Sequence, residues 1–259
     1  MKWRLAVVGS PIEHSLSPVL HEAGLAIAGL EGSSTRVELG VDQGAALREL
    51  MGTTFDAVSV TMPMKEVAAG LCAQLDDVAT RIGVVNSLLM REGRLLGACT
   101  DGRGFIDALV GELSFDVADK NVIIIGAGGA ARGIVDALVE ANARSITVEG
   151  RTAARVKELV ERYETVRPST PQGTTVDLVI NTVPVAGRLE PVAHEGVHDA
   201  TVAVDITYEP RMSKWRALYD ARGCQSANGL SMLAYQAARQ MQWWWDVPVN
   251  GAELLEAIE

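Results

Sequence analysis

The fold is decided by residues 121–155, which read NVIIIGAGGAARGIVDALVEANARSITVEGRTAAR. The stretch opens with an apolar run at 122–125 that is rich in β-branched side chains and too short for a helix, so it predicts a buried strand. A glycine turn follows, then apolar residues at helical spacing, and then a second β-branched run at 145–148. Strand, turn, helix and strand in this order predict a βαβ unit.

Small residues stand where a dinucleotide-binding turn needs them. Gly126 permits the sharp turn, Gly128 lets the backbone approach a pyrophosphate, and Ala131 allows the helix to pack closely. The phosphates would bind N–H groups at the N-terminus of the helix. Glycine turns also occur where no ligand is present, but the complete βαβ context favours a nucleotide site.

The end of the second strand indicates which nucleotide binds. An acidic residue there usually binds the ribose of NAD, whereas arginine accommodates the 2′-phosphate of NADP. Arg151 and Arg155 lie one helical turn apart at the start of a predicted helix, whose N-terminus also favours an anion. They predict NADP. Glu149 leaves two alternatives open, because its carboxylate either points away from the site or binds a ribose.

Composition bounds the class of protein. The 259 residues allow two modest domains or one large domain, and a net charge of −10 argues against nucleic-acid binding. Anionic ligands must therefore be captured by local donors rather than by the overall field. Neither a membrane-length apolar stretch nor a signal peptide is recognisable, so we expect a cytoplasmic protein. The cysteines and histidines are too scattered for a disulfide framework or a metal site, and we expect no metal.

Two serines near the N-terminus form a candidate anion site. Residues 5–9 predict a strand that leads into the turn SPIEHSLSP. Ser17 followed by Pro18 predicts a helix start, with serine as the N-cap and proline at the first helical position. This helix start accounts for Ser17 but leaves Ser15 unexplained. Two hydroxyls beside a helix N-terminus could hold a carboxylate, although capping and turn formation alone remain an alternative.

Lys65 and Asp101 are the candidate catalytic pair. Residues 57–60 predict a buried strand, and Lys65 follows its carboxyl end, where ligands bind in open α/β sheets. A single lysine is more often a solvated surface charge. Asp101 either caps a helix over 105–113 or pairs its carboxylate with the Lys65 ammonium.

Two amides lie in apolar surroundings. Asn86 must find hydrogen-bond partners if it is buried, and a substrate is one possibility. Gln236 lies close to the apolar stripe of a helix that starts after Gly229.

The tryptophans at 243–245 cannot all face one way on that helix. We favour a helix end packed on the core over a dimer contact, and a monomer and a homodimer both remain open.

Separate segments of the chain together resemble the shikimate dehydrogenase family. They occur in the family's order over nearly the whole chain: GSPIEHSLSP, SVTMPMK, IGVVNS, CTDGRG, GAGGAAR, GRTAAR, DITYEP and NGLSMLAYQ. The resemblance implies a two-domain α/β enzyme that reduces 3-dehydroshikimate to shikimate with NADPH, in the biosynthesis of chorismate and aromatic amino acids. It implies an α/β substrate domain formed by 1–101 and completed by C-terminal helices at 229–259, and a Rossmann-type NADP-binding domain at 102–228.

The resemblance also implies roles for individual residues. Ser15, Ser17 and Tyr208 would bind the substrate carboxylate. Thr61, Asn86 and Gln236 would bind its hydroxyls, and Lys65 and Asp101 would be catalytic. The implied cofactor-binding residues are Gly126, Ala127, Gly128, Gly129, Ala130, Arg151, Thr152, Arg155, Ile206 and Gly229.

Three positions depart from the family pattern, since Ser59, Cys99 and Gly150 stand where asparagine is usual. Substrate and cofactor preference are therefore less determined than the reaction class. Alternatives are a quinate/shikimate or aminoshikimate dehydrogenase of the same fold, a folate-linked methylene dehydrogenase, and a non-catalytic NADP-binding sensor. The serine pair and the Tyr208 segment argue against the folate enzyme. The joint presence of Lys65 and Asp101 argues against the sensor.

Overall fold

The computed structural model describes residues 2–184 and 193–259. The chain divides into two compact units, Met1–Gly111 with Ser231–Glu259, and Glu112–Leu230. The divisions fall within helix α5 (Asp101–Leu113) and at the start of helix α9 (Leu230–Trp245). The domain bounds implied by the resemblance, at 101 and 229, stay a prediction. The predicted fold class is confirmed: both units are α/β, and the C-terminal helices complete the first unit.

The first unit contains a mixed sheet with strand order β2-β1-β3-β5-β6-β4. Its strands are β1 (Lys2–Gly9), β2 (Glu31–Glu38), β3 (Ala57–Val60), β4 (Gln74–Leu75), β5 (Ser87–Arg91) and β6 (Arg94–Ala98). Strands β2 and β3 run parallel to β1, whereas β5 is antiparallel to both of its neighbours. The sequence did not predict the β5–β6 hairpin, because its turn has Glu92, at φ 52°, where Asn or Asp would be the usual signal before Gly93.

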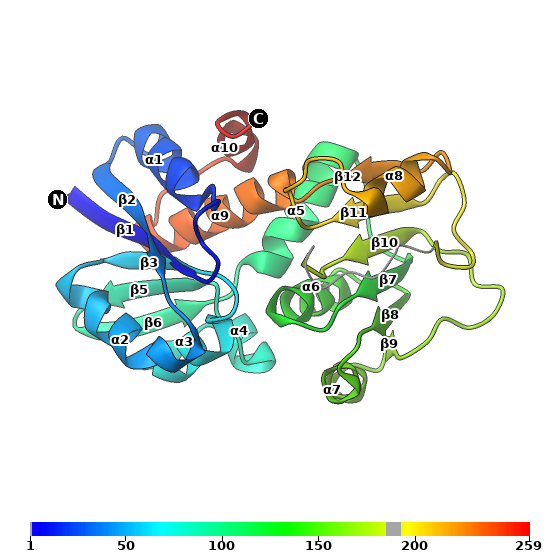
Figure 1. Ribbon diagram of the computed structural model, residues 1–259, viewed down its shortest axis with the longest axis horizontal. Coiled ribbons are helices and arrows are strands. Elements are labelled where there is room, and N and C mark those ends of the chain that lie inside the picture. The colour runs from blue at the N-terminus through cyan, green and yellow to red at the C-terminus, as the bar shows by residue number, and fades with distance from the viewer. Residues whose placement is uncertain (1, 185–192) are drawn as a thin grey trace. The chain divides into compact units, whose positions relative to one another are not determined.

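Helices cover both faces of this sheet (Figure 1). On one face, α2 (Gly44–Thr53), α3 (Lys65–Leu71) and α4 (Asp77–Ile82) bury Leu47, Ala68 and Ile82 with residues of β1 and β3. On the other face lie α1 (Ser17–Ile27), α9 and α10 (Gly251–Glu256). A 3-10 turn at Val41–Gln43 precedes α2. Buried strands between two helical layers give a rigid frame for the loops at their ends.

The second unit contains an all-parallel sheet with strand order β12-β11-β10-β7-β8-β9. Its strands are β7 (Asn121–Ile125), β8 (Ser145–Glu149), β9 (Val166–Arg167), β10 (Leu178–Asn181), β11 (Val202–Asp205) and β12 (Gln225–Ala227), and its helices are α6 (Gly129–Glu140), α7 (Ala153–Arg162) and α8 (Lys214–Asp220). Trp215 and Tyr219 of α8 pack on Ile123, Val179 and Ala203 of the sheet. This is the Rossmann order, in which ligands bind beyond the carboxyl ends of the strands, where the strand order reverses. Here the reversal lies between β7 and β10.

The tryptophans at the end of α9 divide between core and surface. Trp244 and Trp245 are buried, and Trp243 is partly exposed. The helix end therefore packs on the core, and Trp245 lies 6.1 Å from Trp3 between ring centroids. In the described part of the chain no helix is long and apolar enough to cross a membrane.

Candidate active site

Lys65 and Asp101 meet in the first unit. Each is the first residue of its helix, α3 and α5, and Lys65 Nζ lies 2.5 Å from Asp101 Oδ2. Their side chains are 14% and 6% exposed. Helix α5 begins at Asp101 rather than at 105, so Asp101 is its first residue and not its cap. The two carboxylate oxygens of Asp101 accept hydrogen bonds from Lys65 and from the Asn86 amide. A largely buried ammonium beside a buried carboxylate is an arrangement that can support proton transfer, and the catalytic role of this pair stays a prediction.

Asn86 lies just before β5 and is fully enclosed, with 2% exposure. Thr100 N–H donates to Asn86 Oδ1 over 2.8 Å, so the amide nitrogen must point the other way. Nδ2 lies 2.9 Å from each of three oxygens, on Thr100, Asp101 and Gln236. Two N–H groups serve three acceptors, so one hydrogen is shared, and the amide orients the Asp101 carboxylate.

Gln236 reaches this cluster because α9 crosses α5 very closely. A Cβ at Gly104 would lie 2.4 Å from the backbone N of Gln236, so only glycine permits the approach. Thr100 Oγ1 donates to the Gln236 carbonyl over 3.0 Å and ties the two helices together. Sequence reasoning missed Thr100, although it stands directly before Asp101.

The serine turn differs from the prediction in one respect. Helix α1 begins at Ser17 itself, so Ser17 is not the N-cap, and the side chain of the N-cap residue, Leu16, makes no capping hydrogen bond. Instead the Ser15 hydroxyl accepts from the Ser17 N–H over 3.3 Å. Arg36 of β2 donates twice to the Ser15 carbonyl, over 2.9 and 2.6 Å, and holds the turn in place. No sequence motif marks Arg36. The Ser17 side chain, which is buried, is thus not needed for capping.

Thr61 follows β3 at the same sheet edge as Lys65. Its N–H donates to the Val8 carbonyl over 2.9 Å, and its carbonyl accepts from Met64 N–H, also over 2.9 Å. These bonds shape the turn that delivers Lys65 to the start of α3. Thr61 itself is partly exposed.

The glycine turn of the second unit has the geometry of a phosphate loop. Gly126 adopts φ +115°, which side-chain-bearing residues rarely tolerate, and its N–H donates to the Glu149 carbonyl over 2.7 Å. Ala127 is buried, and Gly128 occupies the N-cap position of α6. Gly128 has no side chain that could cap α6, so the N–H groups of the first turn, at Gly129 and Ala130, fit the phosphates of a dinucleotide.

Two exposed arginines flank the start of α7. The helix begins at Ala153, with Thr152 as its N-cap residue, so Arg151 lies just outside the helix and Arg155 in its first turn. Both guanidinium groups are exposed beside the end of β8. Together with the helix N-terminus they fit a phosphate monoester better than an uncharged ribose.

Glu149 is engaged by a residue that the sequence did not indicate. His194 Nε2 lies 3.0 Å from Glu149 Oε2, and His194 Nδ1 lies 3.0 Å from the Tyr219 hydroxyl. The hydrogen bond from His194 lowers the pKa of Glu149 below its usual value, against the effect of partial burial. The glutamate is therefore tied to a protein partner. Sequence reasoning considered His194 only as a metal ligand and found no site for it.

Ile206, Tyr208 and Gly229 lie beyond β11. Gly229 N–H donates to the Thr207 carbonyl over 3.1 Å, and Gly229 packs directly on Ile206, so these two predicted cofactor residues are neighbours. Tyr208 belongs to the second unit, whereas Ser15 and Ser17 belong to the first. The role of Tyr208 with the serines stays a prediction.

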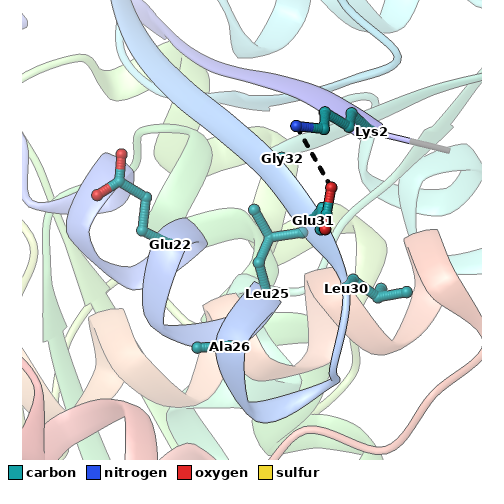
Figure 2. Close-up of a pocket in the computed structure, with 7 residues that line it drawn as sticks. All are labelled: Lys2, Glu22, Leu25, Ala26, Leu30, Glu31 and Gly32. Carbon is teal, nitrogen blue, oxygen red and sulfur yellow. Dashed lines mark ion pairs between the residues drawn. The ribbon is translucent and has the colours of Figure 1, made fainter.

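A surface pocket elsewhere in the first unit contains none of the predicted site residues. It lies between α1 and β2 and is lined by Lys2, Glu22, Leu25, Ala26, Leu30, Glu31 and Gly32 (Figure 2). An ion pair at its edge joins the exposed side chains of Lys2 and Glu31 over 3.4 Å. Within the described residues, no group of three or more histidine, cysteine or acidic side chains could hold a metal.

The fold and the site define a class: α/β proteins with a Rossmann-type nucleotide-binding unit and a second α/β unit that carries a buried lysine–aspartate pair. Residues 7–88 match the family model for the shikimate dehydrogenase substrate binding domain, and residues 109–184 match the model for shikimate / quinate 5-dehydrogenase. The chain belongs to the shikimate dehydrogenase family, as the resemblance implied.

Individual relatives match along nearly their whole length. The chain is 36% identical to the shikimate dehydrogenase (NADP(+)) of an Exiguobacterium species over 262 residues, with 98% of each chain covered. It is 32% identical to that of Geobacillus kaustophilus over 250 residues, covering 92% of this chain and 91% of the relative. The crystal structure of shikimate 5-dehydrogenase from Thermus thermophilus in complex with NADP(H) and shikimate superposes with a TM-score of 0.87 at 32% identity, covering 98% of both chains.

Proposed function

We propose that the protein is an NADP-dependent shikimate dehydrogenase, an oxidoreductase that reversibly reduces 3-dehydroshikimate to shikimate on the route to chorismate and aromatic amino acids. The observation that carries the proposal is the buried contact of Lys65 with Asp101, held by Asn86 and Gln236 in a chain of this family. Full-length relatives that are named for this reaction support it.

The lysine–aspartate pair supplies what reduction of a ketone requires from the protein. Bound NADPH supplies the hydride. As the carbonyl carbon is reduced, negative charge develops on its oxygen, and a positioned donor must deliver a proton there. Lys65 is this donor in the direction of reduction and the acceptor in the direction of oxidation. Asp101 holds the Lys65 ammonium in place through the 2.5 Å contact.

The proposed substrate contacts follow from the resemblance. Ser15 and Ser17, with Tyr208, bind the carboxylate, and Arg36 stiffens the turn that carries Ser15. Asn86, Gln236 and Thr61 bind the ring hydroxyls. The Asn86 and Gln236 side chains already touch each other over 2.9 Å, so both can approach one small ligand. The substrate domain is proposed to comprise 1–101 and 229–259, with 102–228 binding the cofactor and the protein acting as a monomer or homodimer.

The second unit is proposed to bind NADP through its glycine turn and its arginines. The uncapped N-terminus of α6 fits the pyrophosphate, and Arg151, Thr152 and Arg155 fit the 2′-phosphate. The hydrogen bond from His194 occupies Glu149 Oε2, so this oxygen is not available to a ribose hydroxyl. Ile206 and Gly229 are proposed to bind the cofactor as well.

Initial rates with four substrate pairs test the proposal. Shikimate and quinate are each assayed with NADP and with NAD, by following the reduced cofactor. We expect turnover with shikimate and NADP to exceed that of every other pair. A preference for quinate or NAD would support the quinate/shikimate alternative and implicate Glu149, Gly150 and Ser59. NADP binding without turnover of either substrate would contradict the proposal and support the sensor.

A further inference from the structure

Behind Asn86 lies a buried polar chain that the proposed mechanism does not use. Gln240 Nε2 lies 2.6 Å from the Asn86 carbonyl oxygen, and Ser59 Oγ lies 2.6 Å from Gln240 Oε1. His21 Nε2 lies 2.8 Å from Ser59 Oγ, and His21 Nδ1 lies 2.7 Å from Ser34 Oγ. His21, Ser59 and Gln240 are buried, so water does not compete for these bonds.

The direction of each hydrogen bond in this series of side chains follows from the Asn86 carbonyl at one end. A carbonyl can only accept, so the Asn86 carbonyl must face the Gln240 NH₂ group, and Gln240 Oε1 must face Ser59. The Ser59 hydroxyl therefore donates its single hydrogen to Gln240 Oε1 and accepts a hydrogen bond from His21 Nε2–H. Neutral His21 keeps a lone pair on Nδ1 for the Ser34 hydroxyl. Burial agrees with this, because it lowers the pKa of His21 to about 3.

Helix α9 therefore holds Asn86 at two points. Gln236 and Gln240 are four residues apart and face the same side of the helix. Gln236 Oε1 accepts from the Asn86 side chain, and Gln240 donates to the Asn86 backbone. The carbonyl also accepts from Val60 N–H of the β3 end over 2.7 Å. The Asn86 peptide is thus fixed between the sheet and α9.

A displacement of Asn86 would be transmitted to the catalytic pair. Asn86 Nδ2 lies 2.9 Å from Asp101 Oδ1, and Asp101 Oδ2 lies 2.5 Å from Lys65 Nζ. We propose that Gln240, oriented by Ser59 and His21, is a positioning residue that sets the Asn86–Asp101–Lys65 geometry from behind. The catalytic consequence rests on the proposed function, whereas the geometric consequence does not.

Matched variants of α9 test the inference. Gln240→Met removes both hydrogen-bonding groups at similar volume, and Gln242→Met makes the same change at an exposed position of the same helix. We expect kcat for shikimate oxidation to fall roughly 10- to 100-fold in Gln240→Met, with the KM for NADP unchanged and the pH profile of kcat shifted. Gln242→Met should match the wild type. A lower Tm with an unchanged kcat and pH profile would show a merely structural role and overturn the inference.

A second readout does not depend on turnover. The side-chain amide signals of Asn86 are assigned in ¹⁵N NMR spectra as those that disappear in an Asn86→Asp variant. We expect their chemical shifts to change in Gln240→Met and to stay the same in Gln242→Met. If the wild type does not oxidise shikimate, the proposed function fails, and these signals still decide whether Gln240 positions Asn86. Unmoved signals would overturn the positioning role.

Ser59 offers an independent pair of variants should Gln240→Met fold poorly. Ser59→Ala leaves Gln240 Oε1 without its donor, whereas Ser59→Thr keeps the hydroxyl. We expect Ser59→Ala to reproduce the loss of kcat and Ser59→Thr to restore at least part of it. Equal activity of the two variants, at the level of the wild type, would contradict the inference.

Discussion

Asn86 Nδ2 donates to Asp101 Oδ1, and the other oxygen of the same carboxylate accepts from Lys65 Nζ. One carboxylate thus joins an amide fixed by its surroundings to an ammonium at the start of α3. The arrangement separates two roles. In the proposed mechanism Asp101 orients the ammonium and Lys65 transfers the proton, so we expect the two residues to respond differently to substitution.

Lys65→Ala removes the proposed proton donor. We expect kcat to fall roughly 10²- to 10⁴-fold while KM for shikimate changes little, because the donor acts mainly in the transition state. Asp101→Asn should cost less, since the ammonium remains. Circular dichroism spectra of the variants and the wild type verify that the fold is intact. A near-normal kcat in Lys65→Ala would remove this residue from the chemistry.

Arg151 and Arg155 are expected to select NADP. Each charge-assisted hydrogen bond to a phosphate contributes on the order of 1.5–3 kcal/mol. We therefore expect Arg151→Ala or Arg155→Ala to reduce kcat/KM for NADP roughly 10- to 100-fold. The value for NAD should change little, because NAD has no 2′-phosphate. Arg144→Ala, at another exposed arginine of the same unit, is the matched control. Equal losses with both cofactors would show that the arginines support the fold instead.

The second unit was largely predictable from residues 121–155 because a parallel buried strand, a glycine turn and an amphipathic helix leave a strong local pattern. The first unit was harder. Edge strand β2 reads EGSSTRVE, which lacks an apolar alternation, and β4 has only two residues. Neither carries a periodic signal.

Part of the site could also be anticipated. Motif positions and a family resemblance singled out Lys65, Asp101, Asn86 and Gln236, and the structure brings them together. The residues that support them come from distant parts of the chain. Gln240 and Asn86 are 154 residues apart, and a hydrogen bond between them has no local signature.

His194 is expected to influence cofactor choice through Glu149. Loss of the imidazole in His194→Ala leaves the Glu149 carboxylate without its hydrogen-bond partner at the end of β8 and allows its pKa to rise toward the usual range. A carboxylate released from His194 can accept from a ribose hydroxyl, which is the contact typical of an NAD site. We expect the preference for NADP over NAD, as a ratio of kcat/KM values, to fall by roughly 3- to 10-fold.

The double variant His194→Ala with Glu149→Gln separates this effect from damage to the loop. If the carboxylate is responsible, replacing it should restore the preference for NADP, and the two substitutions should be non-additive. A loss that persists in the double variant would show that His194 acts by another route.

His21 makes the stability of the first unit depend on pH. Burial lowers the pKa of His21 to about 3, from 6.5 in the unfolded chain. Between these values the unfolded chain binds a proton that the folded unit excludes, so this contribution to stability is complete above pH 6.5 and is lost as the pH falls toward 3. The expected slope is about 1.4 kcal/mol per pH unit within that window. His21→Gln has no titrating group and should lack this part of the slope. Urea unfolding of both proteins at pH 4.5 and pH 7.5 measures the difference, and an identical change in free energy for the two would show that His21 is not the group responsible.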